Sequence, residues 1–435
     1  MKRLSVLMIV LIVLTSMLAF PPYATAQKQL VYVLVDQRIQ QDIIFHLDRW
    51  EIDIENIGFR VTIVPIDCSE CTPANIRAIF IDAYSEGLVG SLLIGNIPVA
   101  TYEDLTDDET LPIDLFYADL NGTWVDIDSN GNYDQHTGHR APEIWIGRLH
   151  ASDVSENEIS LYQRYFDRNH AYRTGNWSLA DEALIYIDDP WIGSSDDTDY
   201  YVSRLYKDRV LIDEPNTTSA QDYLERLATQ NWSLVHIKTH GNYTHHALKA
   251  NSQWTWISNE DIRSVNPRAL FYNLFSCESC CFSEPDYIGG CYLFSSYGLA
   301  VIGPTDKGGM LFCSDFYSNL NNNTLGFSFK AWLTERMAEE DEGHWYSRDW
   351  FYGMVMLGDP TLLILQDAEK PTVTLLGDVN GDKRVDAIDL AVIALIFGSR
   401  RGDLAYDASC DFNQDNQIDI IDLVVVAHLY GTEYS

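Results

Sequence analysis

Short apolar runs alternate with longer amphipathic segments through the first part of the chain. The apolar runs are predicted strands, at residues 30–35, 59–64, 91–94 and 142–149. Residues 41–54 have the apolar spacing of a helix, and Thr72 followed by Pro73 is typical of the start of another. The second strand is expected to stop at Pro65, which cannot donate to a sheet. Strands that alternate with helices predict a parallel α/β sheet.

The same alternation resumes after a linking helix. Ser155 and Glu158 have the spacing of a capping box, so this helix is expected to begin there and to end near Thr174. Buried strands are predicted again before Asp188, before His240 and before Ser276. We therefore expect two α/β subdomains, residues 27–175 and 176–366.

The first residues have the pattern of a secretory signal. Lys2 and Arg3 precede an apolar stretch at residues 4–20, and Ala24-Thr-Ala26 fits a cleavage site. No other apolar run is long enough to span a bilayer. The sequence predicts a signal peptide at residues 1–26 and a secreted protein, without membrane insertion after cleavage.

The net charge of the chain indicates which kinds of molecule it is expected to bind. The chain has 64 acidic and 29 basic residues, a formal charge of −35. Such a surface argues against nucleic acid and anionic membranes as partners. It suits a protein that binds calcium.

A loop near the C-terminus occurs twice, because Asp411 follows Asp378 by 411 − 378 = 33 residues. Each copy places side-chain oxygens at positions 1, 3, 5, 9 and 12, the spacing of loops that bind calcium. The predicted ligands are Asp378, Asn380, Asp382, Asp386 and Asp389 in one copy and Asp411, Asn413, Asp415, Asp419 and Asp422 in the other. An apolar helix closed by glycine follows each loop, so we expect two calcium ions here.

This repeated pattern resembles a dockerin, the module that binds cohesin domains, at residues 375–435 after a linker at 367–374. The resemblance implies that Arg384 and Gln417 add backbone carbonyls to the two calcium sites. It also implies a cohesin on a scaffold or cell-surface protein as partner, met by the apolar pairs Ala387-Ile388 and Ile420-Ile421. The alternative is a calcium-dependent stabilising cap without a partner.

Two predicted strands end at residues that can do chemistry together. His240-Gly241 follows one and Ser276-Cys277 follows the next, and ligands of parallel sheets collect at such strand ends. A thiolate is the nucleophile of cysteine enzymes, and a nearby imidazole can take the proton and return it to a leaving amine. The N–H of Gly241 could approach an oxyanion, and a helix after Cys277 would stabilise the thiolate.

The order of several further stretches, together with these two, resembles the gingipain-like family of cysteine peptidases in the caspase-like clan. The stretches span roughly residues 90–365: 93–98, 114–119, 142–149, 298–303 and 358–361. The resemblance implies a three-layer α/β sandwich, peptide or protein substrates, His240 as general base and acid, and Cys277 as nucleophile. The N–H groups of Gly241 and Cys277 would form the oxyanion hole.

The cysteines leave open which thiol is reactive and whether disulfides form. Cys280 replaces the glycine usual in that family, so Cys280 or Cys281 could be the reactive thiol instead. These cysteines could also be disulfide partners, and Cys68-x-x-Cys71 is a plausible local disulfide. The competing class is a catalytically silent scaffold or binding component displayed through the dockerin.

Two further acidic sites attract attention. Asp188 and Asp189 end a strand at the same predicted sheet edge, where they could orient His240 or line a pocket that prefers Arg or Lys; a solvated turn is the alternative.

Separately, Asp126, Asp128, Asn130 and Asp134 match positions 1, 3, 5 and 9 of a calcium loop, without an acidic residue at position 12. That loop predicts a third, structural calcium ion, against the alternative of an Asx-rich turn.

Overall fold

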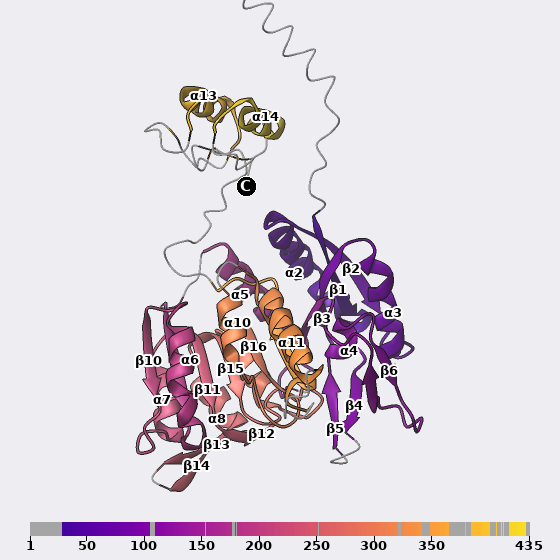
Figure 1. Ribbon diagram of the computed structural model, residues 1–435, viewed down its shortest axis with the longest axis vertical. Helices are drawn as coiled ribbons and strands as arrows, with labels where there is room; N and C mark the ends of the chain where they lie inside the picture. The colour runs from indigo at the N-terminus through magenta and orange to yellow at the C-terminus, as the bar shows by residue number, and fades with distance from the viewer. Residues whose placement is uncertain are drawn as a thin grey trace, which may run out of the picture. The chain divides into compact units, whose positions relative to one another are not determined.

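The computed structural model describes two compact units, which divide after Ile364 (Figure 1). The described residues are 28–104, 109–152, 154–175, 179, 181–250, 252–320, 323–341 and 349–364 in the first unit, and 379, 384–400, 406, 410, 412 and 417–431 in the second. The predicted signal peptide and linker lie outside the described residues.

One ten-stranded sheet forms the centre of the described part of the first unit. Its order is β10-β9-β11-β15-β16-β17-β8-β3-β1-β2, with every neighbouring pair parallel except β16 and β17. The strands are β1 (Gln29–Asp36), β2 (Phe59–Ile66), β3 (Leu88–Ile94), β8 (Trp145–Leu149), β9 (Glu182–Ile187), β10 (Asp208–Ile212), β11 (Trp232–Lys238), β15 (Ala269–Phe275), β16 (Ala300–Pro304) and β17 (Met354–Gly358). The two predicted halves therefore share one sheet, joined by the antiparallel β17.

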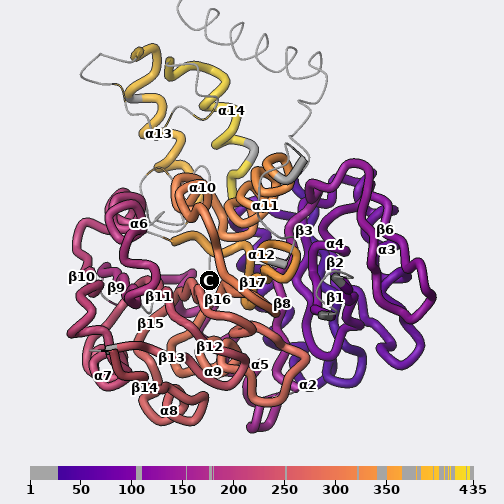
Figure 2. Tube along the Cα trace, turned by 60° about the horizontal axis from the view of Figure 1, so that its bottom comes forward, coloured from indigo at the N-terminus to yellow at the C-terminus, as the bar shows by residue number. Residues whose placement is uncertain are grey.

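Helices cover both faces of this sheet (Figure 2). One face packs against α2 (Gln37–Asn56), α5 (Glu158–Arg173), α7 (Ala220–Thr229), α8 (Asn259–Val265) and α9 (Ile288–Leu293). The other packs against α3 (Pro73–Tyr84), α4 (Leu115–Ala118), α6 (Ser195–Val202), α10 (Cys313–Asn319), α11 (Leu325–Asp341) and α12 (Asp349–Tyr352). Successive residues of β1 enter the two cores alternately, as the pleat requires. The predicted three-layer α/β sandwich is confirmed.

Local signals predicted most elements but not all of their boundaries; the strand predicted at 142–149, for example, begins at Trp145. Strand β2 continues through Pro65 to Ile66, and this is tolerated because β2 is the edge strand of the sheet. Helix α5 is capped by Asn157, whose side chain accepts from the Ser160 N–H, so the predicted capping box at Ser155 is wrong. Ser155 instead donates its N–H to Asp286, 131 residues further along the chain.

The Gly358-Asp359 turn after β17 has a structural role. The buried Asp359 carboxylate accepts from Trp50 of α2 and from Asn169 and Arg173 of α5, at 2.6, 2.8 and 2.7 Å. These partners, Arg173 foremost, hold the pKa of Asp359 below its usual value despite its burial. The turn thereby fixes β17 to two helices of the first predicted half.

The second unit repeats one motif twice. Helices α13 (Ala387–Ile396) and α14 (Ile420–Leu429) each begin at an aspartate that closes a capping box with a second aspartate three residues on. A small apolar core joins the copies: Val385, Ile393, Cys410, Ile418 and Val426. An antiparallel bridge between Arg400 and Gln417 further connects them.

Candidate active site

The His240 and Cys277 positions are brought together by the register of two adjacent strands. Strands β11 and β15 are parallel neighbours, and Lys238 pairs with Phe275 at their ends. The two candidates each lie two residues beyond that pair, and Thr239 N–H donates to the Phe275 carbonyl at 2.9 Å in between. Because neighbouring strands are about 4.8 Å apart, both residues lie at the same point of the sheet edge.

His240 is exposed and lies between aromatic rings. Its ring centroid is 4.7 Å from that of Trp191, in the 3₁₀ segment Asp189–Ser194 after β9, and 5.6 Å from that of Trp254. Trp254 belongs to β14 (Gln253–Ser258), which forms a small sheet with β12 (His240–Asn242) and β13 (His245–Ala250). The imidazole is therefore accessible and held on two sides.

Cys277 is half-buried, and a backbone amide points at its sulfur. Gly308 N–H donates to Cys277 Sγ at 3.4 Å, from the loop that follows β16. The expected helix directly after Cys277 is wrong, because Glu278 has a positive φ of 54° and the next helix, α9, begins only at Ile288. The Gly308 N–H supplies the polar donor that the helix was expected to supply.

The remaining thiols are poorer candidates for the nucleophile. Cys68 and Cys71 do not form a disulfide, so the local disulfide that their spacing suggested is wrong. Burial raises the pKa of the Cys280 thiol, which is fully enclosed, and raises that of Cys281 to about 11. A buried thiol with a raised pKa is a poor source of thiolate, which leaves Cys277 as the accessible sulfur at this edge.

Close packing surrounds the backbone between the two candidates. A Cβ added to Gly241 would lie 2.3 Å from Ser276 Oγ and 2.5 Å from the His245 carbonyl oxygen, so only glycine fits there. Ser276 Oγ lies 2.9 Å from Nδ1 of the buried His246, and burial lowers the pKa of His246 to about 3. His246 is thus neutral and contacts Ser276, the residue that precedes Cys277. No sequence pattern predicted this contact, because it joins two residues 30 positions apart.

Asp188 and Asp189 both lie at this edge but in different surroundings. Asp188 is buried; its Oδ1 accepts from Lys249 N–H at 3.0 Å, and its Oδ2 has no hydrogen-bond partner. Burial raises the pKa of Asp188, and that shift is opposed by backbone hydrogen bonds from Lys249 and Asp189 and, less strongly, by His240. The Asp189 carboxylate lies 3.5 Å from Lys249 Nζ. Asp188 is therefore the candidate that interacts electrostatically with His240.

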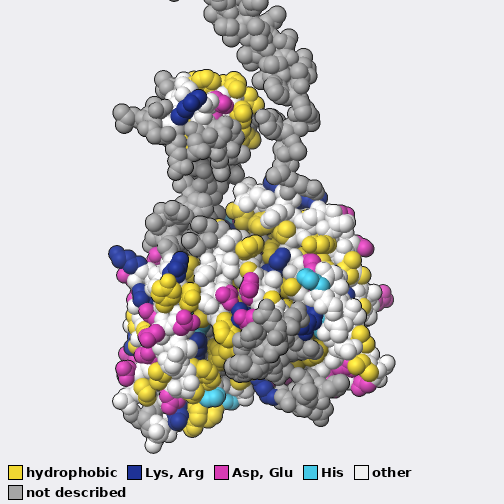
Figure 3. Space-filling model, in the orientation of Figure 1, with side chains coloured by type: hydrophobic (Ala, Val, Ile, Leu, Met, Phe, Trp, Pro, Cys, Tyr) yellow, Lys and Arg dark blue, Asp and Glu magenta, His cyan; other side chains and the backbone are white. Residues whose placement is uncertain are grey.

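The other histidines of this region pack inside or line the rim. His236 is buried, and its Nδ1 lies 2.6 Å from the Tyr317 hydroxyl. His245 lies against Trp256, which is 58% exposed, beside Trp254, which is 47% exposed. Figure 3 shows hydrophobic side chains and a histidine at the surface near this small sheet.

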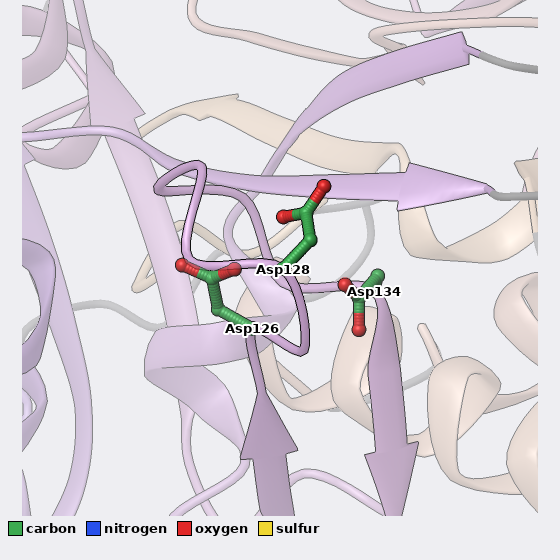
Figure 4. Close-up of side chains that lie close together, drawn as sticks. All are labelled: Asp126, Asp128 and Asp134. Atoms are coloured by element: carbon green, nitrogen blue, oxygen red, sulfur yellow. The ribbon is translucent and has the colours of Figure 1, made fainter.

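The predicted calcium ligands of the second unit fall partly within the described residues. Asp378, Asn380, Asp382, Asp411, Asn413 and Asp415 lie outside them, whereas Arg384, Asp386, Asp389, Gln417, Asp419 and Asp422 lie within. Asp389 accepts from Val379 N–H at 2.7 Å, and Asp422 accepts from Phe412 N–H at the same distance. The two loops are thus closed in the same way. In the first unit, Asp126, Asp128 and Asp134 lie together as predicted (Figure 4).

A mostly parallel sheet covered on both faces, with a thiol and an imidazole at its carboxyl edge, is characteristic of caspase-like cysteine hydrolases. The chain belongs to peptidase family C25, whose model matches residues 39–365. This is the gingipain family of the caspase-like clan, so the resemblance drawn from the sequence is confirmed. A Dockerin type I domain model matches residues 376–429.

These matches define two activities at family level. Family C25 proteins are cysteine peptidases, which act on protein substrates, and dockerins bind calcium and cohesins in general. No curated protein matches the chain. Among the described residues, no helix has the length and apolar character needed to cross a membrane.

Proposed function

We propose that this chain is a secreted cysteine endopeptidase whose catalytic dyad is Cys277 and His240. The register of β11 and β15 carries the proposal, since it brings an accessible thiol and an exposed imidazole to one point of the sheet edge. The Gly308 N–H at 3.4 Å from Cys277 Sγ supports it further, because an amide donor stabilises the charge of a thiolate.

In the proposed reaction, the Cys277 thiolate attacks the carbonyl carbon of the scissile peptide and forms a carbon–sulfur bond. The carbonyl oxygen becomes an oxyanion, which the N–H groups of Gly241 and Cys277 would stabilise. Protonated His240 gives its proton to the leaving amine as the carbon–nitrogen bond breaks. His240 then takes a proton from water, whose oxygen displaces Cys277 and releases the acid product.

Asp188 would orient His240 and stabilise its protonated form. Its unpartnered Oδ2 and its electrostatic interaction with His240 support this role over a solvated turn. Asp189 would line the pocket next to the scissile bond. We predict that this pocket prefers Arg or Lys. A basic substrate side chain would compete with Lys249 for the Asp189 carboxylate.

The second unit would attach the peptidase to a cohesin-bearing scaffold or cell-surface protein. We propose two calcium ions for it, one in each loop, with Arg384 and Gln417 giving carbonyl oxygens. Ile388 and Ile420 support a partner-binding face, since both are about half exposed, at 54% and 49%.

The dyad is tested by peptide hydrolysis with the reduced, calcium-loaded chain and its Cys277→Ala and Cys280→Ala variants. Loss of activity in Cys277→Ala alone is expected, because Cys280 is enclosed in the core. Loss in Cys280→Ala with an unchanged melting curve would instead move the nucleophile. Peptides with Arg, Lys, Asn or Asp before the scissile bond test the pocket, and no preference for Arg or Lys would overturn the proposed role of Asp189.

Inactivity of all forms toward a broad peptide set would favour the scaffold alternative. Cohesin binding by the intact chain, with and without a calcium chelator, then becomes the deciding measurement. Binding that persists unchanged in chelator would contradict the calcium-dependent attachment.

A further inference from the structure

A third ion-binding candidate lies in the first unit, in the loop of residues 126–134. A two-stranded ribbon, β6 (Thr123–Val125) and β7 (Gln135–Thr137), closes the ends of this loop, and Asp134 N–H donates to the Val125 carbonyl at 3.0 Å. Gly131, at the turn, has a φ of 98°, which favours glycine. The loop therefore has fixed ends and a sharp central turn.

Three carboxylates gather inside this loop (Figure 4). One oxygen from each of Asp126, Asp128 and Asp134 lies within 4.8 Å of the others. Backbone N–H groups hold two of them, since Gly131 N–H donates to Asp126 at 2.9 Å and Asn130 N–H donates to Asp128 at 3.1 Å. These contacts alone would fit an Asx-rich turn.

Asp134 distinguishes an ion site from such a turn. It is only 8% exposed, its Oδ2 accepts from Ile127 N–H at 3.0 Å, and its Oδ1 is buried without a hydrogen-bond partner. A buried carboxylate oxygen left without a donor costs free energy unless a cation satisfies it. Among the described residues, no Lys, Arg or His pairs with the three loop carboxylates.

A fourth carboxylate reaches the loop from a neighbouring hairpin. Glu103 belongs to β4 (Ala100–Asp104), which pairs with β5 (Glu109–Ile113), and its Oε2 accepts from Asn130 Nδ2 at 2.6 Å. Its backbone is fixed to the loop as well, because Glu103 N–H donates to the Tyr133 carbonyl at 2.8 Å and Tyr133 N–H to the Thr101 carbonyl at 2.9 Å. The Glu103 oxygens are not among the three that lie within 4.8 Å of one another, so Glu103 would move toward the ion to supply the acidic ligand that the loop lacks at its twelfth position, Thr137.

We propose that Glu103, Asp126, Asp128, Asn130 and Asp134 bind one calcium ion in the first unit. Oxygen ligands, most of them carboxylates, are those that calcium prefers, and its flexible geometry accepts a ligand supplied by a separate hairpin. The Asn130 NH₂ group lies between Glu103 and Asp128, at 2.6 and 3.2 Å. The Asn130 Oδ1 accepts from Asn132 N–H at 2.8 Å, and a half-turn of the amide would exchange that hydrogen bond for a bond to the ion. The ion would then clamp the β4–β5 hairpin to the loop.

This clamp is distinct from the loops of the second unit, so the test counts ions on the intact chain. Equilibrium dialysis against calcium compares the Cys277→Ala chain with the same chain carrying Asp126→Asn and Asp128→Asn together. Both side chains are at least partly exposed, so the pair should fold. Asp208→Asn, an exposed carboxylate of β10, is the control for loss of charge.

The expected result is one ion fewer per chain in the double variant and no change in Asp208→Asn. Glu103→Gln tests the closing ligand, and we expect it to weaken the affinity of this site at least about tenfold while the other ions stay bound. An unchanged ion count in the double variant would overturn the site. An unchanged affinity in Glu103→Gln would remove the hairpin from it.

Discussion

Mild acid should destabilise the first unit through His246. This imidazole is buried against Ser276 Oγ, next to the nucleophile position, and burial lowers its pKa from 6.5 to about 3. The folded state therefore binds the proton more weakly than the unfolded state does. The contribution of His246 to stability is intact above pH 6.5 and is lost as the pH falls from there toward 3.

The size of this effect follows from the two pKa values. At pH 5 the unfolded chain has protonated His246 almost fully, whereas the folded chain, with a pKa of about 3, has not. Linkage then gives a loss of about 2 kcal/mol in the free energy of unfolding between pH 7 and pH 5. That is a large share of the roughly 5–15 kcal/mol by which domains are stable. His236, whose pKa is also far below its usual value, adds in the same direction.

Comparing the Cys277→Ala chain with the same chain carrying His246→Asn isolates this histidine. Asparagine keeps a polar partner for Ser276 but does not titrate, and His236 is present in both. Urea unfolding at pH 7 and pH 5 is followed by tryptophan fluorescence, since all 11 tryptophans lie at or before position 350 and report on the first unit. The chain with His246 should lose about 2 kcal/mol more than the variant. Equal losses would refute the reasoning.

Other consequences can be measured on the same chain. Gly241→Ala should lower kcat/KM at least about 100-fold, because its Cβ would lie 2.3 Å from Ser276 Oγ, whereas Gly193→Ala, with nothing within 4 Å, should be neutral. Asp188→Asn should lower kcat about tenfold or more with little change in KM, and an unchanged kcat would remove its proposed role. Chelation of calcium should lower the melting temperature of the second unit, as loss of a bound ligand requires, and an unshifted transition in circular dichroism would contradict calcium binding there.

The sequence predicted the strands of the sheet well because each is a short apolar run with a clear end. The prediction of His240 and Cys277 as the catalytic pair rests on the same strand ends, since parallel strands end at one edge and both residues follow strands directly. The repeat at residues 378–422 could be recognised from the sequence as well, because ligand spacing within one loop is a local property. Whether a strand lies at the edge of its sheet is not a local property, so the continuation of β2 through Pro65 could not be predicted.

Contacts between segments that are distant along the chain could not be predicted from the sequence. Glu103 lies 27 residues from Asn130, and its reach to the 126–134 loop depends on how the β4–β5 hairpin docks. The capping box at Ser155 failed similarly, because Asp286 binds that serine and leaves Asn157 to begin the helix. Spacing rules describe neighbours along the chain, and they fail where a tertiary partner offers a competing hydrogen bond.

The surroundings of Cys277 follow from strand order once it is known. Because β16 lies beside β15, the loop after β16 must pass the end of β15, and Cys280 N–H donates to the Pro304 carbonyl at 2.8 Å. This contact carries the chain on to Gly308, whose φ is 104° and whose added Cβ would lie 2.4 Å from Trp350. Only glycine can aim its N–H at the sulfur there. The Gly-rich turn that the sequence displays without a role thus has one, set by the pairing of β15 with β16.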